Sequence, residues 1–128
     1  MKGSSGKGLL REAMRLDAAG KEGAAIPIYR RAISLGLAKQ DLRDALIGLG
    51  SSLRSVGQAK ASIRVLQKAR LMFPGDPTVT LFLALAHADN GQTLLALRQL
   101  ADTLLKESTE VGLRDYRRVL QRKYHGLR

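Results

Sequence analysis

Three glycines divide the chain into units of nearly equal length. Gly20, Gly57 and Gly91 lie 37 and 34 residues apart, and each separates two segments with apolar residues at helical spacing. Glycine commonly ends a helix because it tolerates positive φ. Other residues recur at fixed distances from these glycines: Ala13, Gly50 and Ala84 seven residues before, Ala25, Ser62 and Ala96 five after, and Tyr29, Leu66 and Leu100 nine after. This repetition predicts stacked copies of one unit.

Each unit is predicted to be a pair of helices. Apolar residues at helical spacing follow the second glycine: Ile63, Val65, Leu66, Ala69 and Leu71. Pro74 and Gly75 then end this helix, and Asp76 with Pro77 provides the N-cap and first residue of the next. The small residues before and after each glycine allow the two helices to approach closely. One such hairpin cannot bury its apolar face alone, so the units are expected to stack.

The composition favours an all-α fold. The 128 residues suffice for one domain, and Leu and Ala are abundant whereas β-branched residues are few. The chain has no Cys, which excludes disulfides and thiol chemistry. Its two histidines, His87 and His125, are far apart and lack the spacing of metal ligands, so we expect neither a metal nor a cofactor.

The first eight residues are predicted to be a flexible lead. The sequence MKGSSGKG lacks the second glycine and the hydroxyl residue that a phosphate-binding loop requires. It also has no apolar segment typical of a secretory signal. The longest apolar run, from Leu81 to Ala86, is too short to span a bilayer. We therefore expect a soluble cytoplasmic protein without membrane association.

The residues after Glu110 predict a seventh, amphipathic helix over about residues 111–126. Its apolar residues recur every three or four positions and would cover the exposed end of the last unit: Leu113, Tyr116, Leu120 and Tyr124. Another face is basic and carries Arg114, Arg118 and Arg122. A solvated surface is one interpretation of this basic face, and a contact with an acidic protein or a nucleic acid is the other.

These units resemble the tetratricopeptide repeat family. The 34-residue period and the small, aromatic and Pro positions of that family are matched best in the second unit, by Leu46, Leu49, Gly50, Leu53, Gly57, Leu66, Ala69 and Pro74. The resemblance, closest to small stand-alone bacterial members, covers about residues 6–110 in repeats 6–39, 43–76 and 77–110. It implies a right-handed α-solenoid in one domain, residues 9–128, with a capping helix. It also implies a non-enzymatic module for protein–protein interaction.

The resemblance also implies a concave groove lined by the first helix of each hairpin. The residues expected there are Leu10, Met14, Ile47, Ser51, Arg54, Leu81 and Leu85. They predict a largely apolar surface for a peptide or helix of a partner protein. The alternative is that the apolar members pack between hairpins. Some chaperone-binding members hold a carboxylate with basic and amide residues, but the corresponding positions here are Leu10, Met14, Gly48, Thr78 and Phe82, so that specificity is not expected.

The formal net charge of +11 raises a second function class, electrostatic binding of nucleic acid. The chain lacks the stacking aromatics or reading module that would support it, so we rank nucleic acid below a protein partner. Catalysis ranks last, because His87 is expected in the core and no acid–base pair stands out. Residues 77–110 are net −2, whereas residues 111–128 are net +5, which suggests self-association into a homodimer.

Overall fold

The computed structural model describes residues 5–127, and within them the chain forms eight α-helices. Their bounds are α1 Gly6–Ala18, α2 Glu22–Leu35, α3 Lys39–Ser55, α4 Ala59–Met72, α5 Pro77–Asp89, α6 Thr93–Glu107, α7 Val111–Asp115 and α8 Arg117–His125. The all-α prediction is confirmed. The predicted number of seven helices is wrong, because the last segment is interrupted at Tyr116.

The expected flexible lead of residues 1–8 is only partly within the described structure. Residues 6–8 belong to α1, whose N-cap is Ser5. The Ser5 Oγ accepts a hydrogen bond of 3.0 Å from the backbone N–H of Gly8, which satisfies one free donor of the first turn. Residues 1–4 lie outside the described range.

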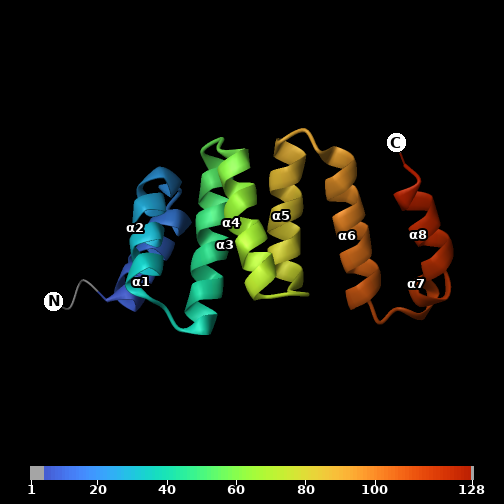
Figure 1. The fold of residues 1–128 in the computed structure, drawn as a ribbon, viewed down its shortest axis with the longest axis horizontal. Helices are drawn as coiled ribbons and strands as arrows, with labels where there is room; N and C mark the ends of the chain where they lie inside the picture. The colour runs from blue at the N-terminus through green and yellow to red at the C-terminus, as the bar shows by residue number, and fades with distance from the viewer. Residues whose placement is uncertain (1–4, 128) are drawn as a thin grey trace.

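The helices are arranged as three hairpins in a row, with the two ends of the chain at opposite ends of the molecule (Figure 1). The pairs α1–α2, α3–α4 and α5–α6 form the hairpins, and α2–α3 and α4–α5 contacts join them. The first helices also contact each other, α1 with α3 and α3 with α5. These three helices therefore share one side of the stack.

The turns have the chemistry that the sequence predicted. Gly20, Gly57 and Gly91 have φ of +77°, +85° and +81°, which L-residues with a side chain rarely adopt. Asp76 is the N-cap of α5, because its Oδ1 accepts hydrogen bonds from the N–H groups of Thr78 (2.9 Å) and Val79 (3.3 Å). Each hairpin turn is thus closed by a glycine with positive φ, and α5 is started by its own N-cap.

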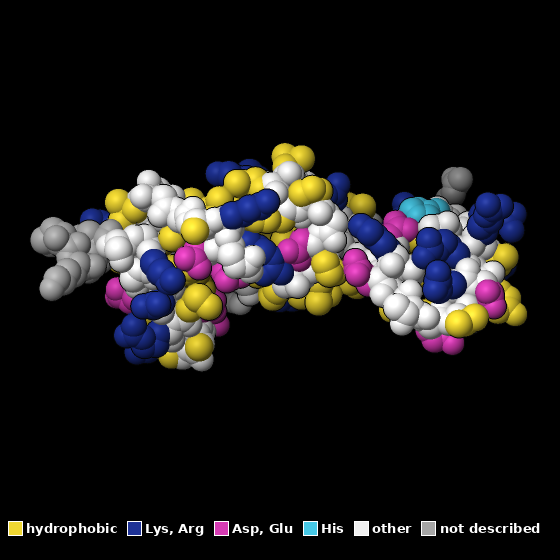
Figure 2. All heavy atoms as spheres, turned by 90° about the horizontal axis from the view of Figure 1, so that it is seen from below, with side chains coloured by type: hydrophobic (Ala, Val, Ile, Leu, Met, Phe, Trp, Pro, Cys, Tyr) yellow, Lys and Arg dark blue, Asp and Glu magenta, His cyan; other side chains and the backbone are white. Residues whose placement is uncertain are grey.

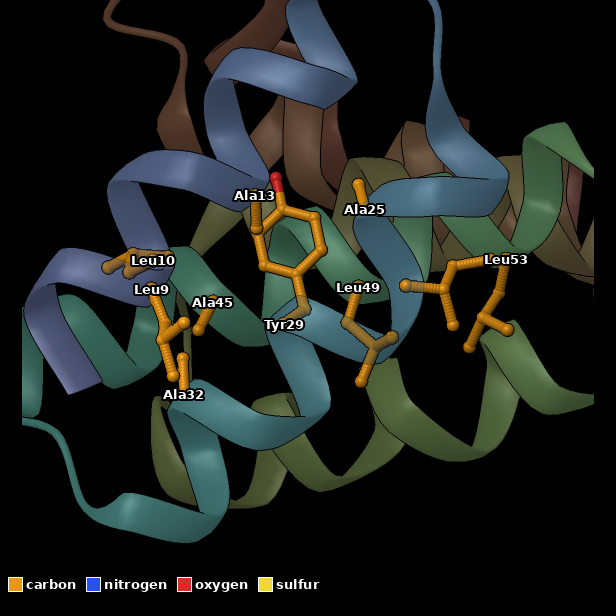
Figure 3. Packing of buried hydrophobic residues seen from close by; sticks show 10 residues of the cluster. Leu9, Leu10, Ala13, Ala25, Tyr29, Ala32, Ala45, Leu49 and Leu53 are labelled. Carbon is orange, nitrogen blue, oxygen red and sulfur yellow. The ribbon is translucent and has the colours of Figure 1, made fainter. Parts of the chain in front are cut away.

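Three clusters of buried residues form the core. The largest joins α1, α2 and α3 around Tyr29, whose ring is packed among small and aliphatic residues (Figure 3). A second joins Ile63 and Leu66 of α4 to Leu83 and Ala86 of α5. The third joins Leu46, Ala69 and Val79 of α3, α4 and α5. The apolar faces of the first two hairpins are therefore buried by the unit that follows each of them.

Two glycines of α3 allow bulky side chains to lie on its backbone. A Cβ at Gly48 would lie 2.4 Å from Cζ of Tyr29, and a Cβ at Gly50 would lie 2.5 Å from Cγ of Leu66. Ser62 Oγ donates a buried hydrogen bond of 2.7 Å to the carbonyl oxygen of Gly50. The contacts of Gly50 confirm that small residues bring the paired helices α3 and α4 close together, and Gly48 does the same between α3 and α2 of the preceding hairpin.

The C-terminal end is less well covered than the sequence predicted. Tyr116, one of the four expected covering residues, is 63% exposed, and no described residue of α7 or α8 is buried. Leu100, which has the same position after its glycine as the buried Tyr29 and Leu66, is 37% exposed. Leu71 was also placed on the apolar face of α4, yet it is 83% exposed, because it follows the buried Ala69 by two positions and points away from the core.

Candidate functional site

The shared side of α1, α3 and α5 contains a hollow of about 360 Å³. α1 contributes its last turns, α3 contributes most of the floor, α5 closes one side, and Tyr29 reaches in from α2. The lining residues are Met14, Asp17, Tyr29, Arg43, Asp44, Ile47, Gly48, Ser51, Thr78 and Phe82. The hollow therefore combines apolar side chains with one guanidinium and two carboxylates.

Only part of the predicted groove lies in this hollow. Met14, Ile47 and Ser51 line it. Leu10 does not, because it is 3% exposed and packs in the core of the first hairpin. Its expected place on the binding surface is therefore wrong.

The other three predicted groove residues lie outside the hollow. Leu81 is exposed and Leu85 is half-buried. Arg54 Nε lies 2.6 Å from Asp89 Oδ2, within ion-pair distance but without the geometry of a hydrogen bond. The Arg54 guanidinium is thus partly neutralised by a neighbouring carboxylate.

Tyr29 links the core to the hollow. Its hydroxyl donates a hydrogen bond of 2.8 Å to Asp17 Oδ2, and its ring lies against Gly48. Burial, and then the hydrogen bond to Asp17, raise the pKa of Tyr29 well above its ordinary value. The phenol therefore stays protonated and holds the Asp17 carboxylate in place at the edge of the hollow.

Arg43 holds the stacked second and third hairpins together. Its Nε donates to Asp76 Oδ2 at 2.5 Å, its Nη2 to Asp76 Oδ1 at 3.2 Å, and its Nη1 to Asp44 Oδ1 at 3.1 Å. The hydrogen bond from Arg43 holds the pKa of Asp76 below its ordinary value. Because both carboxylates occupy the guanidinium, Arg43 offers little free positive charge to a ligand.

Seven lining residues are not among the predicted groove residues. Asp17, Thr78 and Phe82 lie on the inner face that helical phase indicates, whereas Tyr29, Arg43, Asp44 and Gly48 were not placed there. Asp44 and Gly48 share a helical stripe with Ile47 and Ser51, so strict i, i+3, i+4 counting could have found them. The position of Arg43 depends on Asp76, 33 residues later, and no local pattern indicates that pairing.

The remaining candidates have structural explanations or lie at the C-terminal end. His87 is buried, as predicted, with Nδ1 2.9 Å from Gln92 Oε1. Arg114, Arg118 and Arg122 are exposed, and among residues 5–127 none of them takes part in an ion pair. Arg118 and Arg122 line a shallow hollow of about 470 Å³ with Gln121. Figure 2 shows basic side chains gathered over the α7–α8 end, and acidic and basic ones interspersed along the middle.

Within the described residues, no cluster of three or more His, Asp or Glu side chains could hold a metal ion. None of the helices there combines the length and apolar character needed to cross a bilayer. The hollow and the basic C-terminal end are the two surfaces that contain several of the predicted site residues.

The family model described as tetratrico peptide repeat matches residues 6–126. A search of curated proteins and a search of solved structures gave no significant match. Repeats of this kind generally mediate protein–protein interactions and are typically non-catalytic. The match spans nearly all of the chain, and the three stacked hairpins agree with it, so the chain belongs to the tetratricopeptide repeat family.

Proposed function

We propose that the chain is a non-enzymatic interaction module that binds a peptide or helix of a partner protein in the hollow formed by α1, α3 and α5. The observation that carries the proposal is the mixed lining of this hollow. Met14, Ile47 and Phe82 provide apolar contact area, and polar groups converge beside them. A concave apolar surface with a few fixed polar groups is typical of ligand sites in proteins.

The charges of the hollow favour a ligand with a basic group. Arg43 is the one basic residue among the lining residues, and Asp44 and Asp76 already neutralise it. Asp17 has no cationic partner among residues 5–127 and accepts its hydrogen bond from a neutral phenol. A Lys or Arg next to an aliphatic residue would pair with Asp17 while the aliphatic side chain covers Met14.

A displayed peptide library tests this proposal. Selection on the wild-type chain should enrich peptides in which a basic residue adjoins an aliphatic one. Each enriched peptide is then measured by fluorescence anisotropy against Met14→Asp and Asp17→Asn, with Leu71→Asp as the matched surface control. Asp17→Asn keeps an acceptor for Tyr29 but removes the charge. Equal affinity for all four proteins would contradict binding in the hollow.

Two other occupants give different results. A second copy of the chain could cover the groove, its basic C-terminal segment meeting the acidic region 77–110 of the first copy. Sedimentation velocity at two salt concentrations detects such a dimer, which should weaken with salt if charge pairing dominates. Nucleic acid would instead bind at physiological salt with a steep dependence of affinity on salt. A monomer without nucleic-acid affinity leaves the hollow free for a foreign peptide.

A further inference from the structure

The last hairpin leaves uncovered the face that the earlier hairpins bury. In α4, Ile63 and Leu66 are 9% and 0% exposed because Leu83 and Ala86 of α5 pack on them. Thirty-four residues later, the corresponding residues of α6 are Leu97 and Leu100, which are 44% and 37% exposed. Leu104, whose counterpart in α4 is the exposed Arg70, extends this apolar face by one turn and is 59% exposed. We call these three residues of α6 the leucine stripe.

The C-terminal segment that follows α6 carries an arginine at the central position where α3 and α5 carry a covering leucine. The residues that pack on the preceding hairpin are Ala45 and Leu49 in α3, and Val79 and Leu83 in α5. The same spacing places Leu113 and Arg117 in the C-terminal segment. Burying the guanidinium of Arg117 against leucines would cost several kcal/mol, on the order expected for an uncompensated buried charge. Arg117 instead donates to the carbonyl oxygen of Leu105 at 2.9 Å.

α8 is consequently held beside the leucine stripe by polar contacts. Tyr124 donates its hydroxyl hydrogen to Asp102, and His125 Nε2 lies 3.3 Å from the same carboxylate. Arg98 Nε donates to the carbonyl oxygen of Tyr124 at 3.5 Å. Arg98, Asp102 and Leu105 lie on a different face of α6 from Leu97, Leu100 and Leu104, as their spacing along the helix requires.

The outer face of α1 lacks the covering residues of α3 and α5. A second copy stacked head-to-tail, with its first hairpin on the last hairpin of this one, would therefore not cover the leucine stripe. The residues of α1 that correspond to Ala45 and Leu49 are Gly8 and Glu12, and the next position on that face is Arg15. Glu12 and Arg15 are both exposed. A charged face would have to be buried on leucines if the first hairpin of one copy followed the last hairpin of another.

We propose that the leucine stripe is a docking site for an acidic amphipathic helix of a partner protein, packed as α5 packs on α4. The partner helix should carry aliphatic residues at the spacing of Val79, Leu83 and Ala86, which are the residues of α5 that pack on α4. Its acidic character follows from charge, because α8 contacts α6, and residues 111–127 carry five Lys or Arg against Asp115, a net of +4 that outweighs the net −2 of residues 77–110. This site is separate from the hollow of α1, α3 and α5.

The probe is a fluorescein-labelled peptide of residues 76–90 with four outward positions changed, Thr78→Glu, Leu81→Glu, Leu85→Glu and Ala88→Glu. It keeps the packing face of α5 and the Asp76 cap. Fluorescence anisotropy with the full chain should show saturable binding. Leu83→Arg in the peptide should weaken binding at least tenfold, because it copies the arginine found at position 117. A second control peptide, with lysines in place of the four glutamates, should weaken binding similarly.

Variants of the protein locate the site. Leu100→Asp should weaken binding of the probe at least tenfold, whereas Leu71→Asp, an equally drastic change on another exposed surface, should leave it within twofold. Circular dichroism melting of each variant confirms that it is folded. Met14→Asp separates this site from the hollow, because it should change only binding to the hollow.

Four results would overturn the proposal. Equal binding to Leu100→Asp and wild type would place the peptide elsewhere, and loss with Met14→Asp alone would place it in the hollow. Equal binding of the lysine peptide would contradict the acidic partner. If the wild-type chain sediments as a dimer and Leu100→Asp as a monomer, a second copy covers the leucine stripe instead.

Discussion

Gly48→Ala tests the packing that unites the core with the hollow. The added Cβ would lie 2.4 Å from Cζ and 2.5 Å from the hydroxyl oxygen of Tyr29, closer than real Cβ contacts come. Tyr29 is 1% exposed and its hydroxyl is bound to Asp17, so the ring has little room to move. Overpacking of this kind costs about 1–3 kcal/mol, and alanine in a helix recovers about 0.5–1 kcal/mol relative to glycine. We expect a net destabilisation of about 1–2 kcal/mol.

Chemical denaturation followed by circular dichroism measures this change, with Gly23→Ala as the matched control. Gly23 also lies in a helix, α2, but a Cβ there meets no atom within 4 Å. Gly23→Ala should therefore leave stability unchanged or raise it by up to about 1 kcal/mol. In a thermal scan, Gly48→Ala should lower the melting temperature by roughly 4 °C per kcal/mol.

A second substitution shows whether the ring is the cause. In the next repeat the position of Tyr29 is held by Leu66, and the position of Gly48 by Phe82, so a leucine there tolerates a side chain opposite. Tyr29→Leu should therefore reduce the cost of Gly48→Ala, giving a coupling energy of about 0.5–3 kcal/mol in a double-mutant cycle. If Gly48→Ala is as stable as wild type, or the two changes are additive, the close approach of ring and helix is refuted.

Three further predictions concern the polar contacts of the fold; the first two are measured by denaturant unfolding and the third by thermal melting and hydrogen exchange. Ser52 Oγ is buried without a hydrogen-bond partner among residues 5–127, so Ser52→Ala should leave the free energy of unfolding unchanged or raise it by about 1 kcal/mol. Ser62→Ala removes a buried hydrogen bond and should lower the free energy of unfolding by about 1 kcal/mol. Equal effects of the two substitutions would contradict this assignment. Asp76→Ala should cost about 1 kcal/mol for the cap and a further ~1–3 kcal/mol for leaving Arg43 with one partner fewer, whereas Asp76→Asn keeps the cap. Because the folded-state pKa of Asp76 is lowered, its contribution is present at neutral pH and disappears as pH falls below its unfolded value of about 3.9, so Asp76→Asn should reduce the loss of stability in acid. Arg117→Leu should raise the melting temperature and protect α8 from hydrogen exchange, and an unchanged exchange rate would show that Arg117 does not keep α8 from docking.

The sequence predicted the hairpins and their ends because the signals are local. Gly57 and Gly91 require positive φ, and Asp76 followed by Pro77 starts a helix whatever surrounds it. The groove was predicted only in part, because helical phase tells which residues share a face but not how deeply each is buried. Leu10 and Met14 are four residues apart, yet Leu10 is covered by the α2 and α3 core and Met14 is 47% exposed.

The cap shows where periodicity misleads. Leu113, Tyr116, Leu120 and Tyr124 have the spacing of a covering face, so the sequence predicted one unbroken helix packed on the last repeat. Counting from the covering residues of α3 and α5 instead would have found Arg117 where Leu49 and Leu83 are buried. The identity of the residue at one central position therefore outweighs the spacing of its apolar neighbours.

The two ends of the solenoid differ in the polarity of their outer faces. At the N-terminal end of the described stack, the face of α1 that corresponds to the covering faces of α3 and α5 carries the exposed Glu12 and Arg15 instead of leucines. At the C-terminal end, Leu97 and Leu100 keep the apolar character of a face that is buried in the other repeats. A helix that covered them would add apolar burial of the kind that joins α4 to α5, without breaking any contact of the first two hairpins. A partner helix therefore gains the most apolar burial at the C-terminal end, because α8, the chain's own covering helix, is held there by only a few polar contacts.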